Sequence, residues 1–328
     1  MKYYVAPLEG ITGYVFRNVH NRFFSGIDKY FIPFIEPKPN SKKIFTGREK
    51  NDTLPEHNQG MTVVPQILTN KWEDFLWTAE KLKDLGYEEV NLNLGCPSRT
   101  VVSKNRGSGF LAFPDDVDAM LYYIFDQLDM RVSVKTRLGK EDSHEFEKLM
   151  EVYNKYPLEE LIIHPRTQKQ LYRGRPDYEA FQIALESAKI PVCFNGDIVL
   201  GKDFEWITQQ FPKIQAMMVG RGVLRNPGLI QEGQTGKRTD RKILRAYHDE
   251  MLQTYQSELS GEIHALHKMK ELWCYMIDFF EHTDKEKKAL TKAKKIKEYI
   301  PAANYILEQC EMRFDQGGRW TFRYSLDE

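Results

Sequence analysis

The chain has 328 residues, of which 41% are apolar and 12% aromatic, so it can bury a large core, and its length suits one large domain plus a smaller one. Its 47 basic and 47 acidic residues cancel, so composition gives no sign of a polyanionic partner, and any nucleic-acid surface must be local. No stretch approaches the roughly 18 apolar residues of a membrane span, and the four cysteines are too far apart for a disulfide framework or a zinc site. We therefore expect a cytoplasmic protein with reduced thiols, no membrane contact and no metal.

Short β-rich apolar runs alternate with amphipathic helical stretches over about the first 235 residues, which is the pattern of βα units around a parallel sheet. Eight strands are predicted, at residues 3–6, 29–33, 62–67, 89–94, 131–137, 161–164, 191–195 and 216–220. Helices are predicted at residues 71–85, 114–128, 143–155, 178–188 and 202–211. Eight βα units in this length favour an α/β fold of the (β/α)8 TIM-barrel type, with an open doubly wound sheet as the alternative.

From residue 237 the periodicity is helical, with expected helices at 241–259, 264–280, 284–299 and 302–313. We predict a barrel catalytic domain over residues 1–236 and a small C-terminal α-helical bundle domain over residues 237–328. The tail at 319–324 mixes arginine with aromatic residues, so it could stack on bases or dock on the bundle.

A run of basic residues lies within the predicted bundle. Residues 285–297 hold seven lysines and one glutamate, while Leu290, Ala293, Ile296 and Ile300 recur at helical spacing. This pattern is typical both of a solvated helix face and of a local surface for nucleic acid. If it binds RNA, the candidates for phosphate contacts are Lys288, Lys292 and Lys295.

A lone cysteine follows the fourth predicted strand, in the run Asn91-Leu92-Asn93-Leu94-Gly95-Cys96-Pro97. The leucines alternate with the asparagines as a strand requires, and Pro97 stops the strand from continuing. Cys96 is thus presented at a strand's C-terminal end, where it can be a buried structural thiol or a catalytic one.

Polar residues end nearly every other strand as well. They are Gln66, Asn93, Lys135, Arg137, His164, Arg166, Asn195 and Asp197. Each alone is more often a structural residue, but in a (β/α)8 barrel the C-terminal strand ends meet on one face, where the active site lies. Their convergence favours the catalytic interpretation of Cys96.

A glycine-flanked arginine follows the last strand, in Gly220-Arg221-Gly222. Such a segment fits the phosphate site that these barrels commonly build after strands seven and eight, and Asn195-Gly196-Asp197 supplies the neighbouring loop. A ring attached to that phosphate would be held by Gln66, Lys135 and the backbone near Pro7, Leu8 and Glu9. A flavin mononucleotide (FMN) fits this arrangement, and so does a phosphorylated sugar.

Several of these motifs together resemble the dihydrouridine synthases over essentially the whole chain. The resemblance lies in Ala6-Pro7-Leu8-Glu9-Gly10-Ile11-Thr12, Pro65-Gln66-Ile67, residues 91–98 with their Cys-Pro, Val134-Lys135-Thr136-Arg137, His164-Pro165-Arg166-Thr167, Asn195-Gly196-Asp197-Ile198 and Gly220-Arg221-Gly222. Glu9 and the long helical C-terminus look more like the bacterial branch that acts on the D-loop, with position 16 of the RNA as a possible target. Pro165 and Tyr178 stand where many members have glycine and tryptophan.

The resemblance implies an enzyme that binds FMN, is reduced by NADPH, and saturates the 5,6 double bond of uridines in tRNA. Reduced flavin would deliver a hydride to C6, and Cys96 would protonate C5 as the general acid. Lys135 and His164 would contact the flavin. Asn93, Arg137 and Arg166 would bind the uracil, and Arg99 would join the lysines in reaching RNA phosphates. By resemblance we also expect a monomer.

Alternatives remain open at this point. Residues 97–110, with Gly107 and Gly109 around Ser108, form either a loop that closes over the base or an ordinary surface connection. The chain could instead be a small-molecule flavin oxidoreductase, such as a dihydroorotate dehydrogenase-like or ene-reductase-like enzyme, or an RNA-binding protein with a degenerate barrel. The sequence does not distinguish transfer from ribosomal RNA, or NADPH from NADH.

Overall fold

The computed structural model describes residues 1–39 and 44–315, and the chain in it forms two compact units. The first unit comprises Met1–Glu9, Asp28–Gly196 and Phe211–Met218. The second comprises Gly10–Ile27, Asp197–Gln210 and the described residues from Val219 on. The domain boundary predicted between residues 236 and 237 stays a prediction. Across 1–39 and 44–315 no helix has the length and apolar character needed to cross a membrane.

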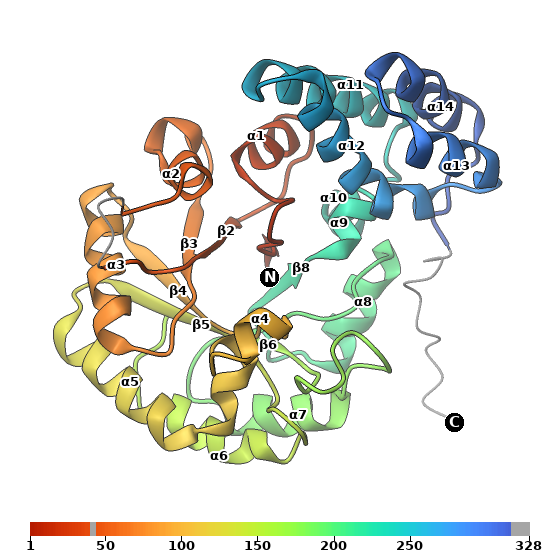
Figure 1. The fold of residues 1–328 in the computed structure, drawn as a ribbon. Helices are drawn as coiled ribbons and strands as arrows, with labels where there is room; N and C mark the ends of the chain where they lie inside the picture. Colours follow the sequence, from red (N-terminus) through yellow and green to blue (C-terminus); the bar gives the residue numbers. More distant parts are fainter. Residues whose placement is uncertain (40–43, 316–328) are drawn as a thin grey trace. The chain divides into compact units, whose positions relative to one another are not determined.

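The first unit is built on a closed barrel of eight parallel strands in sequence order, each hydrogen-bonded to the next (Figure 1). The strands are β1 (Lys2–Val5), β2 (Lys29–Ile35), β3 (Val63–Ile67), β4 (Glu89–Leu94), β5 (Arg131–Arg137), β6 (Leu161–His164), β7 (Val192–Phe194) and β8 (Ala216–Val219). The predicted (β/α)8 TIM barrel is confirmed, and closure of the sheet excludes the open doubly wound alternative.

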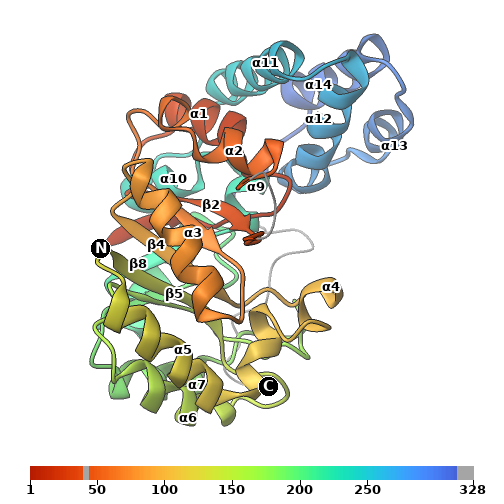
Figure 2. The same ribbon diagram turned by 60° about the vertical axis from the view of Figure 1, so that its left-hand side comes forward.

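Helices of the first unit form a layer outside the strands. They are α2 (Gly47–Thr53), the 3-10 turn η1 (Pro55–His57), α3 (Trp72–Asp84), α4 (Arg99–Val102), the 3-10 segment η2 (Gly107–Ala112), α5 (Pro114–Gln127), α6 (Glu145–Tyr153) and α7 (Tyr178–Ser187). Consecutive members of the series α3, α5, α6 and α7 pack against each other along the outside of the barrel (Figure 2). Pro114 begins α5 and two aspartates follow it in the first turn, which suits the unpaired N–H groups and positive dipole there.

Burial in the barrel explains the alternating pattern of β4. All six residues of this strand are buried, although apolar Val90, Leu92 and Leu94 alternate with Glu89, Asn91 and Asn93. In a barrel one strand face lies against the helices and the other lines the interior, so the polar set is enclosed. The interior also holds an apolar cluster, formed by Tyr4, Ala6, Phe31, Val64, Ile162, Cys193, Ala216 and Met218.

The second unit is helical. Its helices are α1 (Tyr14–Phe23), α8 (Gly201–Gln210), α9 (Arg221–Arg225), α10 (Leu229–Thr235), α11 (Arg241–Glu258), α12 (Glu262–Met276), the 3-10 turn η3 (Ile277–Phe279), α13 (Asp284–Lys292) and α14 (Ile296–Gln309). Helix α11 packs against α1, α12 and α14, and α13 packs against α14. The predicted C-terminal helical segment is confirmed, and the predicted tail at 319–324 lies outside the described residues.

The break between the last two helices is not where the sequence predicted it. Helix α13 ends at Lys292 and α14 runs through Pro301, so the predicted junction near residue 300 is wrong. Long-range hydrogen bonds fix the break instead, because Lys270 Nζ donates to the Ala293 carbonyl at 2.7 Å and the Ile296 N–H donates to Glu262 at 2.9 Å. These contacts come from α12 and leave no signal in the local sequence.

Candidate active site

The polar strand ends of the first unit are neighbours in the barrel. In the strand register Asn93 lies opposite Lys135, and Arg137 lies opposite His164. Gln66 of β3 donates to Asn91 at 2.8 Å and accepts from Asn93 at 2.7 Å. The structure thus brings together, at the C-terminal end of β3 to β6, the side chains that the sequence predicted to converge.

The backbone around Cys96 is held from three sides. Asn93 Oδ1 accepts the N–H groups of Gly95 at 3.0 Å and Cys96 at 2.9 Å. The Cys96 carbonyl accepts from the backbone N–H of Ser108 at 3.1 Å and from its hydroxyl at 2.9 Å. Arg137 Nε donates to the Gly95 carbonyl at 2.9 Å. The position of the thiol is therefore set by backbone contacts and does not depend on packing of the sulfur alone.

Burial raises the pKa of the Cys96 thiol above its ordinary value, and the Glu9 carboxylate raises it further. A hydrogen bond from the Ser98 backbone and the positive charges of Arg137 and Lys135 oppose this rise without cancelling it. Cys96 consequently stays a protonated thiol at neutral pH, which suits a proton donor better than a nucleophile.

The segment after Cys96 is folded into α4 and η2. Gly107 has φ +55°, and a Cβ there would lie 2.7 Å from the Cys96 carbonyl oxygen, so this position requires glycine. Gly107, Ser108 and Gly109 are buried, with Gly109 close against Val102. These glycines therefore allow close packing on Cys96, and the predicted closure of the segment over a base stays a prediction.

Lys135 is an ammonium without a partner. Burial, together with the charge of Arg137, lowers its pKa to about 8. Its ammonium forms no hydrogen bond or ion pair with any residue in the described ranges 1–39 and 44–315. An enclosed cation that the protein leaves without an acceptor is suited to receive the electronegative atoms of a ligand.

Arg137 is fully buried and connects three loops. Besides Gly95 it donates to the carbonyls of Thr167 at 3.1 Å and Leu171 at 2.7 Å, and its guanidinium lies 5.2 Å from the Tyr172 ring centre. Burial lowers its pKa to about 10, which leaves it charged at neutral pH.

His164 lies beside a second buried arginine. Arg166 donates to His164 Nε2 at 3.0 Å and to the Gly174 carbonyl at 2.8 Å. Because a guanidinium can only donate, Nε2 is the acceptor and a neutral His164 carries its proton on Nδ1.

Two of the other predicted cofactor residues of the first unit have structural contacts. Asn195 donates to the Met218 carbonyl at 2.8 Å and so connects β7 with β8. Glu9, after Pro7 and Leu8, forms an ion pair with Arg48 at 2.7 Å. Arg48 was not singled out from the sequence, because nothing in its own segment shows that it pairs with Glu9.

The predicted phosphate motif belongs to the second unit, where Gly220 directly precedes α9. Arg221 pairs with Asp197 at 2.9 Å. A Cβ on Gly222 would lie 2.1 Å from the Ile198 carbonyl oxygen, so this glycine is needed for backbone packing. Gly196, in the first unit, is explained similarly, since a Cβ there would lie 2.7 Å from the Phe194 ring.

The lysine-rich surface spans α13, the break and the start of α14, and consists of Lys285, Lys287, Lys288, Lys292, Lys294, Lys295 and Lys297. All seven side chains are exposed, and none forms an ion pair with a described residue. Leu290, Ala293 and Ile296 are buried beneath them, whereas Ile300 is exposed and does not belong to that apolar set. In the first unit Arg99 and Lys104 are exposed, and Arg106 lies 3.6 Å from Glu36.

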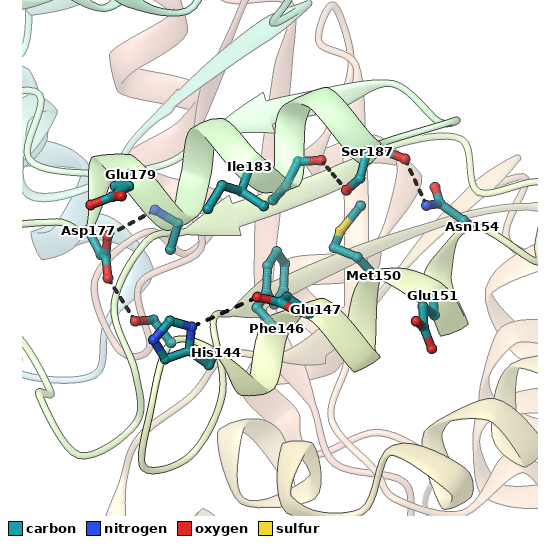
Figure 3. Close-up of a pocket in the computed structure, with 13 residues that line it drawn as sticks. His144, Phe146, Glu147, Met150, Glu151, Asn154, Asp177, Glu179, Ile183 and Ser187 are labelled. Carbon is teal, nitrogen blue, oxygen red and sulfur yellow. Dashed lines mark hydrogen bonds and ion pairs between the residues drawn. The ribbon is translucent and has the colours of Figure 1, made fainter.

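A groove of about 420 Å³ lies elsewhere, on the outside of the first unit between α6 and α7 (Figure 3). Phe146, Met150 and Ile183 line it, with Glu147 and Glu151 among the acidic groups at its border. It contains none of the predicted site residues. Shape alone would therefore direct attention away from the strand ends.

A (β/α)8 barrel with a protonated thiol and buried cations at its C-terminal strand ends defines an enzyme, with the site where such barrels have it. Comparison with known families narrows the class, since the family model described as dihydrouridine synthase matches residues 4–313. The chain belongs to the dihydrouridine synthase family and is an oxidoreductase.

Named relatives agree with this assignment. The chain is 25% identical to a "tRNA-dihydrouridine synthase B" of Pasteurella multocida, over 70% of this chain and 67% of that protein. It is 25% identical to a "Probable tRNA-dihydrouridine synthase" of Rhizobium leguminosarum bv. phaseoli, over 80% and 81%. A protein of the same name from Staphylococcus aureus is 28% identical over 73% of both chains.

Proposed function

We propose that the protein reduces uridines of tRNA to dihydrouridine, with bound FMN, with NADPH as the reductant, and with Cys96 as the proton donor to C5 of the uracil. The observation that carries the proposal is the thiol of Cys96, which is held by backbone hydrogen bonds and kept protonated by burial at the C-terminal end of β4. Membership of the family and the names of the relatives support the substrate.

The residues present fit an FMN ring. Lys135 has an enclosed ammonium without a protein acceptor, and Gln66 keeps one N–H and one lone pair beyond its two amide contacts. Together with His164 and the backbone at Pro7 to Glu9, they would hold the isoalloxazine. Asn195, Gly196, Asp197, Gly220 and Arg221 would hold its phosphate. When bound, FMN would supply the hydride for C6 of the uracil.

Cys96 would complete the reduction from its own sulfur. The proton leaves Sγ for C5, and the thiolate left behind is stabilised by Arg137 and Lys135, whose charges already lower the pKa of this thiol. A general acid of this kind typically contributes a factor of about 10² to 10⁴ to the rate. The raised pKa ensures that the acid is loaded at neutral pH.

Uracil binding would use the remaining donors at the strand ends. Asn93 keeps one N–H of its amide beyond the contact with Gln66, and Arg137 and Arg166 supply fixed positive charge near the base. The backbone of the RNA would contact Arg99 in the first unit and Lys288, Lys292 and Lys295 in the second.

Mass mapping of RNA tests this proposal. Unmodified tRNA is incubated with the purified protein, FMN and NADPH, and each uridine is examined for a gain of about two daltons, the mass of two hydrogens. We expect a gain at one position, which would also identify the modified uridine. Cys96→Ala should lose at least about 100-fold in product formation while NADPH still reduces its flavin.

Cys274→Ala is the matched control, because Cys274 is exposed and lies in α12 of the second unit. It should retain the wild-type rate. Normal turnover by Cys96→Ala would reject Cys96 as the donor. If wild-type protein binds flavin and oxidises NADPH but adds no hydrogen to any RNA, the reaction is that of a small-molecule flavin reductase.

A further inference from the structure

An unbroken series of hydrogen bonds inside the first unit connects the two ends of β4. At the start of the strand, Lys29 Nζ lies 2.7 Å from Glu89 Oε2, and both side chains are buried. At its end, Asn93 holds the Cys96 backbone. Between them Ser133 Oγ bonds Glu89 Oε1 at 2.9 Å, Asn91 Nδ2 bonds Ser133 Oγ at 3.0 Å, Gln66 Nε2 bonds Asn91 Oδ1 at 2.8 Å, and Asn93 Nδ2 bonds Gln66 Oε1 at 2.7 Å.

Both ends of the series have a fixed direction. The partners of Asn93 Oδ1 are the backbone N–H groups of Gly95 and Cys96, which can only donate, so Asn93 must present its oxygen to them. At the other end Glu89 pairs with the Lys29 ammonium, and an ionised carboxylate can only accept. Ser133 must therefore give its hydroxyl proton to Glu89.

The groups in between can each donate and accept, so their neighbours decide how they are oriented. Once the Ser133 proton points to Glu89, its oxygen accepts from the Asn91 amide nitrogen. Asn91 then presents its oxygen to Gln66, and Gln66 presents its oxygen to Asn93. The carboxylate at one end and the backbone N–H groups at the other demand the same direction throughout the series.

We propose that Glu89 is a positioning residue, which acts through this series to hold the amides of Gln66 and Asn93 in one orientation and thereby keeps Cys96 in place. This inference rests on the proposed function, in which Gln66 and Asn93 contact the FMN ring and the uracil. Glu89 lies at the opposite end of β4 from Cys96, so it acts without touching either ligand.

An isosteric change exposes the role. In Glu89→Gln, Lys29 still needs an acceptor, so the new amide turns its oxygen to the lysine and its NH2 group to Ser133. The Ser133 proton must then point to Asn91, and each later amide must turn over until Asn93 directs its NH2 group at two backbone N–H groups. The alternative orientation directs an NH2 group at the lysine, so the variant has a conflict at one end or the other.

Glu160 provides the matched control. It is as deeply buried as Glu89 and also lies at the start of a strand, immediately before β6. Its Oε1 accepts from the Tyr4 hydroxyl at 2.8 Å, and its Oε2 has no hydrogen-bond partner within the described residues. Glu160→Gln thus removes a buried carboxylate near Lys29 without touching the series.

Hydrogen exchange at the Gly95 and Cys96 amides tests the proposal, measured on the full-length protein as purified and again after removal of flavin. We expect these two amides to exchange about fivefold to tenfold faster in Glu89→Gln than in wild type, because each loses its acceptor. Ser133→Ala, which interrupts the series with a smaller change and carries the test if Glu89→Gln fails to fold, should give the same acceleration. The double variant should be no faster than either single one, and Glu160→Gln should match wild type.

Unchanged exchange at Gly95 and Cys96 in both Glu89→Gln and Ser133→Ala would overturn the proposal. Equal acceleration in Glu160→Gln, or an acceleration spread evenly over all barrel strands, would overturn it too, because either would indicate general loosening of the barrel. A local acceleration combined with no dihydrouridine formation by wild-type protein would support the role of Glu89 and reject the proposed function.

Discussion

Lys135 should make the flavin-free protein less stable and the flavin-bound protein possible, and one substitution separates the two effects. Its pKa falls from the ordinary 10.5 to about 8 because burial disfavours the charged form. That difference corresponds to a cost of about 3 kcal/mol to folding at neutral pH. Since the side chain keeps some contact with solvent, we expect Lys135→Met to stabilise the flavin-free protein by about 1–2 kcal/mol.

The pH dependence identifies the cause. Between pH 8 and 10.5 the unfolded chain still holds the lysine proton that the folded chain has lost, so wild-type stability rises with pH in that window. The advantage of Lys135→Met should therefore be full at pH 7 and smaller by about half at pH 9.5. A gain from better packing by methionine would not depend on pH.

Urea unfolding of flavin-free wild type and Lys135→Met at pH 7 and 9.5 measures the stability difference, and titration with FMN measures the affinity. FMN should bind about tenfold or more weakly to the variant, the usual loss when a hydrogen bond from a charged donor is removed. Lys71→Met, at an exposed lysine of the first unit, should change neither quantity. A variant less stable than wild type at pH 7, or a gain that persists unchanged at pH 9.5, would refute the reasoning.

Three further outcomes are expected. Reversing the charge at Lys288, Lys292 and Lys295 should weaken tRNA binding and flatten its salt dependence without loss of flavin, and equal reversal at Lys71, Lys81 and Lys83 should not; unchanged binding by filter assay would make the lysine-rich surface merely solvated. Gly107→Ala should slow product formation and lower the melting temperature more than Gly86→Ala, because both have positive φ but only Gly107 has the Cys96 carbonyl within 2.7 Å of the added Cβ. Burial lowers the pKa of His20 from 6.5 to about 4, so the unfolded chain binds the extra proton first and stability should fall by about 2 kcal/mol between pH 7 and 5. Chemical denaturation of His20→Gln, which keeps a donor for the Pro227 carbonyl, should lack that fall, and an identical pH profile would count against the assignment.

The strands were predictable because each carries its own signal. The limits of β4, β5 and β6 agree with the predicted residues 89–94, 131–137 and 161–164, since runs bounded by turn residues and filled with apolar or alternating side chains have few other solutions. Convergence of the strand-end groups followed from barrel topology alone.

Tertiary contacts account for what the sequence did not predict. Pro301 suggested a helix end, yet α14 continues through it, because Lys270 and Glu262 from α12 fix the break eight to five residues earlier. Arg48 beside Glu9 and the partners of Arg137 likewise depend on segments far away in the chain. One signal was readable but unused, because period two in β4 places Glu89 on the same face as Asn91 and Asn93.

The three carbonyl partners of Arg137 have a mechanical consequence. One guanidinium joins Gly95, in the segment that carries the thiol, to Thr167 and Leu171 in the loop after β6. A displacement of that loop must either break two buried bonds to a charged donor or pull on the residue next to Cys96. The two loops are thus coupled like parts on one axle, and pressure on the exposed Tyr172 and its neighbours would be transmitted to the position of the sulfur.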